Sequence, residues 1–350
     1  MSAPFAVARI GLRASPWWRF GEPIPIHRGR HSHHKASASV PPVRHREDGA
    51  RGGARVRTVA AVDIVVPYWG DPDLFALTVD SVLAQDDDDW TLTILDDHYP
   101  DLTAYERYRG DPRITYVRHE ENIGITANFA QAAQRASADY VCIPGSDDLL
   151  DPGFVRIVKG AIERHPGVDV VQPGVRVIDE HGAPSLPLVD RVKRQLLAPR
   201  GETVLAGQDL ATSLIRGNWL YWPSLTFRTD TLRRHEFRDG FPVIQDLALL
   251  MDIAFAGGSL VYVPEQAFVY RRHEGSASMA ALTGGSRFRD ERRYYRLAHR
   301  LAVEHGWRRT ARAARIRIFS RLHAATVLPG ALLRRDRAGI ASAITHLAGP

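Results

Sequence analysis

Asp147 and Asp148 are adjacent carboxylates that follow the short apolar run 140–143. Two neighbouring carboxylates on a tight turn repel each other, and a divalent cation with oxygen ligands, most naturally Mg²⁺ or Mn²⁺, removes that cost. The competing interpretation is that an Asp caps the next helix, although Asp151 before Pro152 already fits that role. The pair is therefore a candidate metal site.

A second acidic pair, Asp96 and Asp97, follows the alternating run 90–95. A carboxylate in this place can accept hydrogen bonds from a nucleobase N–H or from ribose hydroxyls, and an ordinary strand-to-loop turn is the alternative. The acidic run 86–89 precedes the same strand, so we expect it at the opposite edge, in a solvated loop.

Asp246 opens an apolar stretch of helical character and is preceded by Gln245. In a pocket, such a carboxylate can take a proton from a hydroxyl group as a general base. An Asp in the first turn of a helix is also typical of an N-cap, so both interpretations stay open.

Arg271, Arg272 and His273 follow a short apolar run. The two guanidinium groups could hold a phosphate bidentately, and His273 could bind a metal ion or a diphosphate. Each of the three could equally be a surface group.

Trp219, Tyr221 and Trp222 form an aromatic cluster that precedes Gln245 in the sequence. Flat rings can stack on the faces of sugars, and packing in the core is the alternative. The three rings are therefore candidate acceptor-binding residues.

The elements that must position these residues alternate between strands and helices. Short apolar runs predict strands over 59–66, 90–95, 113–117, 140–143 and 168–171. Helical periodicity predicts helices over 73–84, 101–109, 125–137 and 152–165. This alternation is typical of an α/β fold with a mostly parallel, wound sheet and helices on both faces. Ligands of such sheets bind beyond the carboxyl ends of the strands, where both acidic pairs lie.

The pattern loosens from 172 to 223, where Pro and Gly are frequent. Beyond it we expect a helix over 240–256, short strands over 260–263 and 267–270, and a helical, Arg-rich region over 285–350.

Charge is distributed unevenly along the 350 residues. Residues 1–58 carry 11 Lys and Arg against 3 Asp and Glu, and residues 287–350 carry 15 against 4, whereas residues 59–286 carry 20 against 33. An acidic core suits a phosphate-bearing ligand only where a cation mediates. The basic ends suit an anionic surface, and the absence of a recognisable reader motif argues against nucleic acid.

Arg308, Arg312 and Arg315 recur at helical spacing in the basic C-terminal region. A basic amphipathic helix can lie on an anionic membrane, and packing against the preceding α/β part of the chain is the alternative. Residues 1–58 lack periodicity and are expected to be a disordered basic tail.

The single cysteine, Cys142, excludes an internal disulfide, and its apolar neighbours predict a buried core residue in a protein of a reducing compartment. No run approaches the roughly 18 apolar residues of a membrane span, and the N-terminus lacks the pattern of a signal peptide. We therefore expect a cytoplasmic protein, with peripheral contact to the inner face of the plasma membrane as an option.

Taken in order, these pieces resemble the family 2 glycosyltransferases of the GT-A fold over residues 62–279, roughly 60% of the chain. The matching pieces are Val65-Val66-Pro67-Tyr68, Ile94-Leu95-Asp96-Asp97, Glu121-Asn122-Ile123-Gly124, Ser146-Asp147-Asp148-Leu149-Leu150-Asp151-Pro152, Gln245-Asp246 and Tyr270-Arg271-Arg272-His273. The resemblance implies a GT-A domain over 59–284, with a nucleotide-sugar-binding half over 59–171 and an acceptor-binding half over 172–284. The helical region over 285–350 would follow it.

The resemblance also implies a donor site. Pro67, Tyr68 and Asp97 would hold the nucleobase, with the Tyr68 ring packed on it, and Asn122 would contact the nucleotide sugar. The remaining donor-site residues would bind ribose, the diphosphate and a bridging Mn²⁺ or Mg²⁺. They are Asp147 and Asp148, at the family's Asp-x-Asp position, with Arg271, Arg272 and His273.

Gly145 stands where many members of the family carry the first Asp of that motif. This departure leaves open which of Asp147 and Asp148 ligates the metal directly. It also motivates an alternative, a catalytically inactive member that binds nucleotide sugars or acts as a scaffold.

The implied reaction moves a sugar from a nucleoside-diphosphate sugar, with a UDP-sugar favoured, to an acceptor hydroxyl, with Asp246 as the base and inversion at the anomeric carbon. The acceptor would be a glycan, a glycolipid or a small molecule, most naturally in cell-envelope or polysaccharide synthesis. Two other enzyme classes fit poorly. A nucleotidyltransferase needs a Gly-rich basic loop after the first strand, and a dinucleotide-dependent oxidoreductase needs Gly-x-Gly-x-x-Gly there, whereas this chain has Pro-Tyr-Trp-Gly-Asp.

Overall fold

The computed structural model describes residues 62–185, 188–238, 240–272 and 286–349, and the expected tail over 1–58 and His273 lie outside these residues. The described part is built around one mixed sheet with the strand order β3-β2-β1-β4-β8-β6-β9-β5, and β7 pairs with β9. The strands are β1 Val62–Tyr68, β2 Trp90–Asp96, β3 Ile114–Arg118, β4 Tyr140–Cys142, β5 Leu149–Leu150, β6 Val170–Ile178, β7 Thr203–Ala206, β8 Thr226–Arg228 and β9 Ser259–Arg271.

The sheet has a parallel half and a mixed half. Strands β3, β2, β1 and β4 pair in parallel, and β6 pairs in parallel with β9. The pairs β4–β8, β6–β8, β5–β9 and β7–β9 are antiparallel. The expected α/β fold with helices is confirmed, and the parallel pairing is complete only in the N-terminal half.

Different helices cover the two faces of the sheet, because successive strand residues point to opposite faces. Val62, Ile64 and Val66 pack in one cluster with α1 and α4. Val65 packs in the other with α3, α6 and α8. The helices of this part are α1 Pro72–Leu83, α2 Thr103–Glu106, α3 Ile125–Arg135, α4 Phe154–Arg164, α5 Leu188–Leu197, α6 Gly207–Arg216, α7 Thr229–Arg234 and α8 Gln245–Phe255.

Strand β1 runs through Pro67 to Tyr68, whereas the sequence predicted its end at Pro67. The Val62 N–H donates to Asp89 O at 3.2 Å and Asp97 N–H donates to Tyr68 O at 3.0 Å, so even-numbered residues of β1 bond to β2. The missing N–H of Pro67 therefore faces the β4 side. Pairing with β4 stops at Ile64, so the proline removes no ladder bond.

Two further expectations need correction. The predicted helix over 240–256 begins only at Gln245, and the two predicted strands over 260–263 and 267–270 are one strand, β9. The intervening residues 264–266 stay in β9 because β6 follows them across a register shift at Gly174. A Cβ at Gly174 would lie 2.6 Å from Pro264 O, so only glycine permits this close approach.

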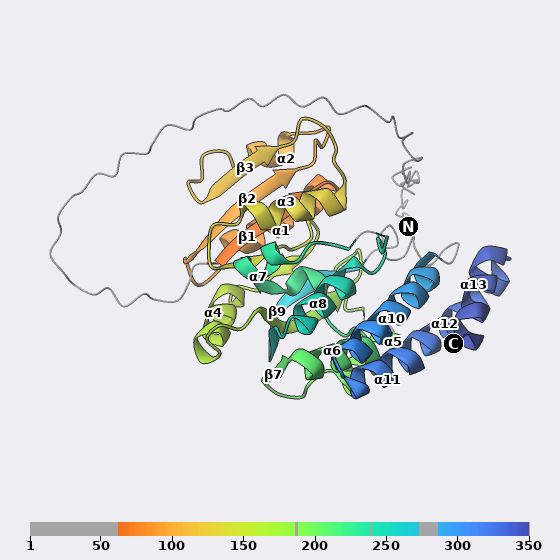
Figure 1. The fold of residues 1–350 in the computed structure, drawn as a ribbon. Coiled ribbons are helices and arrows are strands. Elements are labelled where there is room, and N and C mark those ends of the chain that lie inside the picture. Colours follow the sequence, from red (N-terminus) through yellow and green to blue (C-terminus); the bar gives the residue numbers. More distant parts are fainter. Residues whose placement is uncertain (1–61, 186–187, 239, 273–285, 350) are drawn as a thin grey trace, which may run out of the picture. The chain divides into compact units, whose positions relative to one another are not determined.

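The C-terminal region is helical, as predicted. Its helices are α10 Ser286–Glu304, α11 Arg308–Ile316, α12 Ile318–Leu333 and α13 Arg337–Ala348. Helix α10 contacts α8, α11 contacts α6, and α12 and α13 pack together beside α10, as Figure 1 shows. Among the described residues, no helix combines the length and the apolar character that crossing a membrane requires.

Cys142 in β4 is fully buried, as the sequence predicted. Its Sγ–H faces Pro223 O at 3.6 Å. Burial raises the pKa of the thiol well above its ordinary value.

Asp63 is a buried carboxylate that ties the start of β1 to two neighbouring segments. It accepts hydrogen bonds from Thr91 Oγ1 at 2.5 Å, from Ala138 N at 2.9 Å and from Ser137. Its position at the amino end of β1 places it at the edge of the sheet opposite the two acidic pairs, which lie at or beyond the carboxyl ends of β2 and β4. Its role is to hold β1, β2 and the turn before β4 in register.

We expect Asp63→Ala to lower the free energy of unfolding by about 2–3 kcal/mol, because two backbone N–H donors and two hydroxyls lose their acceptor in a buried place. Urea denaturation measures the loss. The control is Asp88→Ala, at an exposed carboxylate, which should change stability by less than about 0.5 kcal/mol. Equal effects of the two substitutions would refute this role of Asp63.

Candidate active site

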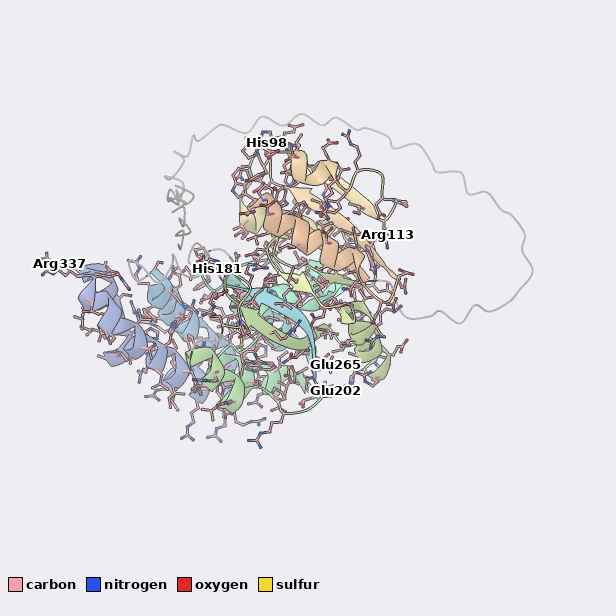
Figure 2. All side chains as sticks on the ribbon, turned by 180° about the vertical axis from the view of Figure 1, so that it is seen from behind. His98, Arg113, His181, Glu202, Glu265 and Arg337 are labelled. Atoms are coloured by element: carbon pink, nitrogen blue, oxygen red, sulfur yellow. The ribbon has the colours of Figure 1, made fainter. Side chains whose placement is uncertain are left out.

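The carboxyl ends of β1, β2 and β4 meet at one edge of the parallel half, called here the carboxyl edge. His98, which follows β2, and Arg113, which precedes β3, mark this edge and the opposite one in Figure 2. A Cβ at Gly70 would lie 3.6 Å from Ser146 Oγ, so the segments after β1 and β4 touch there. The edge thus brings the predicted acidic pairs to neighbouring strand ends.

Asp97 is buried at the carboxyl edge, and its carboxylate organises the loop before α3. It accepts hydrogen bonds from Ile123 N at 2.7 Å and Gly124 N at 3.0 Å. Asn122 Nδ2 donates to the backbone oxygen of Asp97 at 3.1 Å and is exposed. Asp97 and Asn122 therefore lie together, as predicted.

The neighbouring Asp96 has a different environment. It is fully buried, forms an ion pair with Arg118 at 2.7 Å and accepts hydrogen bonds from Tyr99 N and the Tyr116 hydroxyl. These partners occupy its carboxylate. Asp96 is a structural anchor of the edge, and Asp97 is the member of the pair that shapes the candidate site.

Asp147 and Asp148 converge on the backbone of Gly145. A Cβ at position 145 would lie 2.7 Å from Asp147 Oδ1 and 2.7 Å from Asp148 Oδ2, so these oxygens are within twice that distance of each other. Asp148 is buried and accepts hydrogen bonds from Arg271 N at 2.9 Å and Gly145 N at 3.1 Å. Burial raises the pKa of Asp148 well above its ordinary value, and the charge of Asp147 raises it further.

Two carboxylates on the same turn could both reach a hard divalent cation, whose charge would offset the repulsion that helps to raise the pKa of Asp148. Three-residue groups of His, Cys, Asp or Glu suited to a metal are absent from the described part of the chain. The third predicted ligand, His273, lies outside that part. The cation site over Asp147, Asp148 and His273 stays a prediction.

Arg271 is buried and holds the Asp147–Asp148 turn in place. Its backbone N–H bonds to Asp148, its Nε donates to Asp147 O at 3.0 Å, and its Nη1 donates to Asp179 O at 3.4 Å. The sequence suggested that it holds phosphate, but these bonds make it a positioning residue of the acidic turn. Arg272 follows it and is half-buried, with its backbone N–H bonded to Ile178 O.

Asp246 lies in the first turn of α8, one residue inside the helix, since the N-cap position is Ile244. Asn218 Nδ2 donates to Asp246 Oδ2 at 3.4 Å. Burial raises the pKa of Asp246. The backbone N–H groups of Leu247 and of Asp246 itself act in the opposite direction, as do the charges of Arg287 and Lys193. A carboxylate with a raised pKa suits a general base better than an ordinary one.

Two sets of contacts connect Asp246 with the other acidic groups. Thr126 Oγ1 donates to Gln245 Oε1 at 3.0 Å, which joins the start of α8 to the start of α3, beside the Asp97 loop. On the other side, the Tyr221 ring lies 5.4 Å from the Tyr270 ring.

Tyr270 lies close to the turn that carries Asp147 and Asp148. Burial raises the pKa of its hydroxyl, and the charges of Asp148 and Asp147 raise it further. The segment that begins with Asn218 therefore reaches from Asp246 to the neighbourhood of the Asp147–Asp148 turn.

Tyr68 does not lie where the sequence suggested, and the exposed ring at this edge is that of Trp69. The Tyr68 ring is buried and stacks on Phe75 with a centroid distance of 4.0 Å, so it offers no free face to a base. Pro67 is buried as well. Trp69 is the next residue beyond the strand, is 39% exposed and touches Tyr99 edge-on. The period of two could not have found Trp69, since both faces of β1 are buried and alternation gives only the face of a residue. Trp69 is exposed because it lies just beyond the end of the strand.

The three candidate acceptor residues separate into two groups. Trp222 is half-buried and packs against the core beside Phe129, Phe227 and Phe237. Trp219 is only 5% exposed and belongs to the hydrophobic core, whereas Tyr221 is half-buried. Both border a small hollow of about 20 Å³, which has room for roughly one water molecule. The other residues of its lining are Gln172, Pro173, Val175, Arg194, Ala198 and Tyr262.

The chain is similar to known glycosyltransferases. Residues 63–223 match the family described as glycosyl transferase family 2. The chain is 33% identical over 99 residues to the putative colanic acid biosynthesis glycosyl transferase WcaA of Escherichia coli K12, which covers 27% of the chain and 36% of WcaA. It is 26% identical over 137 residues to the putative glycosyltransferase EpsE of Bacillus subtilis, which covers 36% of the chain and 49% of EpsE.

Solved structures resemble a large part of this fold. The S. aureus TarS 1–349 structure superposes with a TM-score of 0.57 at 15% identity and covers 82% of the chain and 81% of that structure. The complex of the same protein with UDP-GlcNAc gives a TM-score of 0.54 at 16% identity and covers 67% and 65%. At such identities the likeness concerns the fold. The matches span 15–49% of the length of the first curated relatives.

We expect Gly145→Ala to weaken cation-dependent nucleotide binding at least about tenfold, or about 1.4 kcal/mol, because the new Cβ would displace both carboxylates. Isothermal titration of a nucleoside diphosphate with Mn²⁺ measures the change. The control is Gly201→Ala, where an added Cβ meets nothing within 4 Å and which should bind as the wild type does. Unchanged binding by a folded Gly145→Ala protein would contradict the convergence at Gly145.

Proposed function

We propose that the protein transfers a sugar from a nucleoside-diphosphate sugar to an acceptor hydroxyl, on the premise that residues 63–223 match glycosyl transferase family 2. The observation that carries the proposal is the convergence of Asp147 and Asp148 at the edge of the sheet where Asp97 lies, with Asp246 linked to both sides. A donor site and a base for the acceptor then occupy one edge. The similarity to WcaA, a putative glycosyl transferase of colanic acid biosynthesis, supports polysaccharide or envelope glycan synthesis as the setting.

The donor is proposed to bind along the carboxyl edge. Trp69 offers an exposed ring for the base, while Asp97 and Asn122 fix the loop beside it. A UDP-sugar is favoured, and the complex of TarS with UDP-GlcNAc, a protein of similar fold, supports that preference. Arg271 keeps the acidic turn in position beneath the diphosphate.

Asp147 and Asp148 would hold Mn²⁺ or Mg²⁺, with His273 as a further ligand. When bound there, the cation supplies positive charge that stabilises the negative charge on the departing diphosphate. Burial removes water from the Asp148 carboxylate and so disfavours its charged form. A cation bound beside it would favour that charged form again.

Asp246 is proposed as the base that takes the proton from the acceptor hydroxyl as its oxygen attacks the anomeric carbon. A single displacement with one base inverts that carbon. Asn218 orients the carboxylate, and the raised pKa strengthens it as a base. Tyr221 is half-buried and offers some ring surface to the acceptor, and Arg194 adds a positive charge nearby. Trp219 borders the same hollow from the core.

We expect a nucleoside diphosphate, UDP first, to raise the melting temperature in the presence of Mn²⁺ and much less in its absence. At about 100 times its Kd, a ligand that binds only the folded state adds about 2.7 kcal/mol of stability. Differential scanning fluorimetry with UDP, GDP, ADP and CDP, each with and without Mn²⁺, measures this. The absence of a shift with every nucleotide would sink the donor assignment.

We expect Asp246→Asn to reduce kcat by about 10²- to 10⁴-fold while the nucleotide-induced shift stays intact, because the amide cannot accept the proton. Because the pKa of Asp246 is raised, the base form is lost as the pH falls through that raised value. Wild-type kcat should therefore decline on the acid side at a higher pH than an ordinary Asp would give.

The matched control is Asp209→Asn, at an exposed carboxylate of α6 paired with Arg309, which should retain wild-type kcat. Nucleotide binding without turnover in the wild type, across donors and acceptors, would favour the alternative of an inactive nucleotide-sugar binder. The substitution of Gly145 for the family's first Asp is the observation behind that alternative.

A further inference from the structure

Helix α12 presents an apolar stripe that no described element covers. Ile318, Leu322, Leu332 and Leu333 are 53%, 54%, 54% and 86% exposed. Ala325 and Pro329 are exposed between them, so the positions fall on one side of the helix over its whole length. These six residues are called the α12 stripe. Exposed large apolar side chains that line up in this way mark a contact surface.

Arginines stand at both ends of the α12 stripe. Arg312 and Arg315 precede it on α11, and Arg334, Arg335 and Arg337 follow it, all of them exposed. Figure 2 shows Arg337 extending outward from the C-terminal helices. From residue 305 to the end, the sequence holds nine Arg and one acidic residue, Asp336. The stripe therefore lies in a strongly positive surrounding with almost no opposing charge.

The apolar stripe and the arginines together indicate which partner could cover this face. A second copy packed on the same face would bring two arginine-rich surfaces together, which like-charge repulsion opposes. The 1–58 segment of the same chain is also basic and would be repelled for the same reason. Nucleic acid suits the arginines but gives no reason for exposed Leu and Ile side chains. An anionic lipid surface satisfies both the apolar stripe and the arginines.

We propose that the α12 stripe and its flanking arginines form a surface that docks on an anionic bilayer. The apolar side chains enter the boundary between headgroups and acyl chains, and the arginines contact the lipid phosphates. Docking would bring the site to acceptors made at that surface, and this purpose is the only part of the inference that rests on the proposed function.

The test is sedimentation of the full chain with vesicles of phosphatidylcholine alone or mixed with phosphatidylglycerol. The wild type should bind the anionic vesicles at least about tenfold more tightly, since each arginine near such a surface contributes about 1 kcal/mol. The preference should shrink at about 0.5 M NaCl, because salt screens the attraction. Equal binding to both vesicles, or binding to neither, would overturn the proposal.

Two substitutions separate the contributions of the stripe and of the arginines. Leu322→Glu should reduce anionic-vesicle binding at least about tenfold, whereas Leu77→Glu, at a residue of α1 of similar exposure, should leave it unchanged. Arg312→Glu with Arg334→Glu should reduce it more strongly than Arg135→Glu with Arg200→Glu, which changes the net charge equally at exposed positions elsewhere. A loss of binding that follows net charge alone would contradict a defined surface.

Further measurements distinguish this inference from its rivals and from the proposed function. Sedimentation equilibrium should give a monomer; a dimer that Leu322→Glu dissociates would replace the bilayer with a second copy and overturn the proposal. Asp246→Asn should bind vesicles as the wild type does, and Leu322→Glu should keep its nucleotide-induced thermal shift. Vesicle binding without any nucleotide response would refute the proposed function alone, and the reverse pattern would refute the docking surface alone.

Discussion

The repulsion between two carboxylates beside Gly145 is the constraint on which the rest of the site depends. Asp148 is buried, where an uncompensated charge costs several kcal/mol, and Asp147 adds a like charge nearby. Two backbone N–H groups, from Gly145 and Arg271, compensate part of that cost. Because one of these donors is the last residue of β9, the turn after β4 is tied to the far half of the sheet. The half that would bind the donor and the half that would bind the acceptor are therefore fixed relative to each other through this acidic turn.

The N-terminal half of the fold could be predicted from the sequence because its interactions are local and repetitive. Each strand is a short apolar run, each crossover helix has an apolar face, and parallel strands place Asp97 and Asp147 at one edge whatever the details. The prediction that was wrong in this half concerned the direction of one side chain. Tyr68 was expected to face a base, but it belongs to the alternating set that packs against α1, and Trp69 has the exposed ring.

The C-terminal half was less predictable because its pairing is not local. β8 lies between β4 and β6 and is antiparallel to both, so residues distant in sequence decide its place. The long β9 was taken for two strands, since Pro264 and Glu265 interrupt its apolar pattern. Gly174 lets β6 approach those residues closely. This is a contact between two strands, so the residue pattern of neither strand alone could predict it. Likewise, Arg271 looked like a phosphate ligand because its charge is visible in the sequence and its burial is not.

The burial of Cys142 has a practical consequence. It is the one thiol in the sequence, no solvent reaches it, and its raised pKa keeps it protonated at neutral pH, whereas the thiolate is the form that reacts. The wild-type chain is thus nearly inert to maleimide reagents without any cysteine removal. A cysteine introduced at a chosen exposed position would accept a single fluorophore or spin label. Distances across the sheet and the depth of the C-terminal helices in lipid then become measurable on an otherwise unaltered protein.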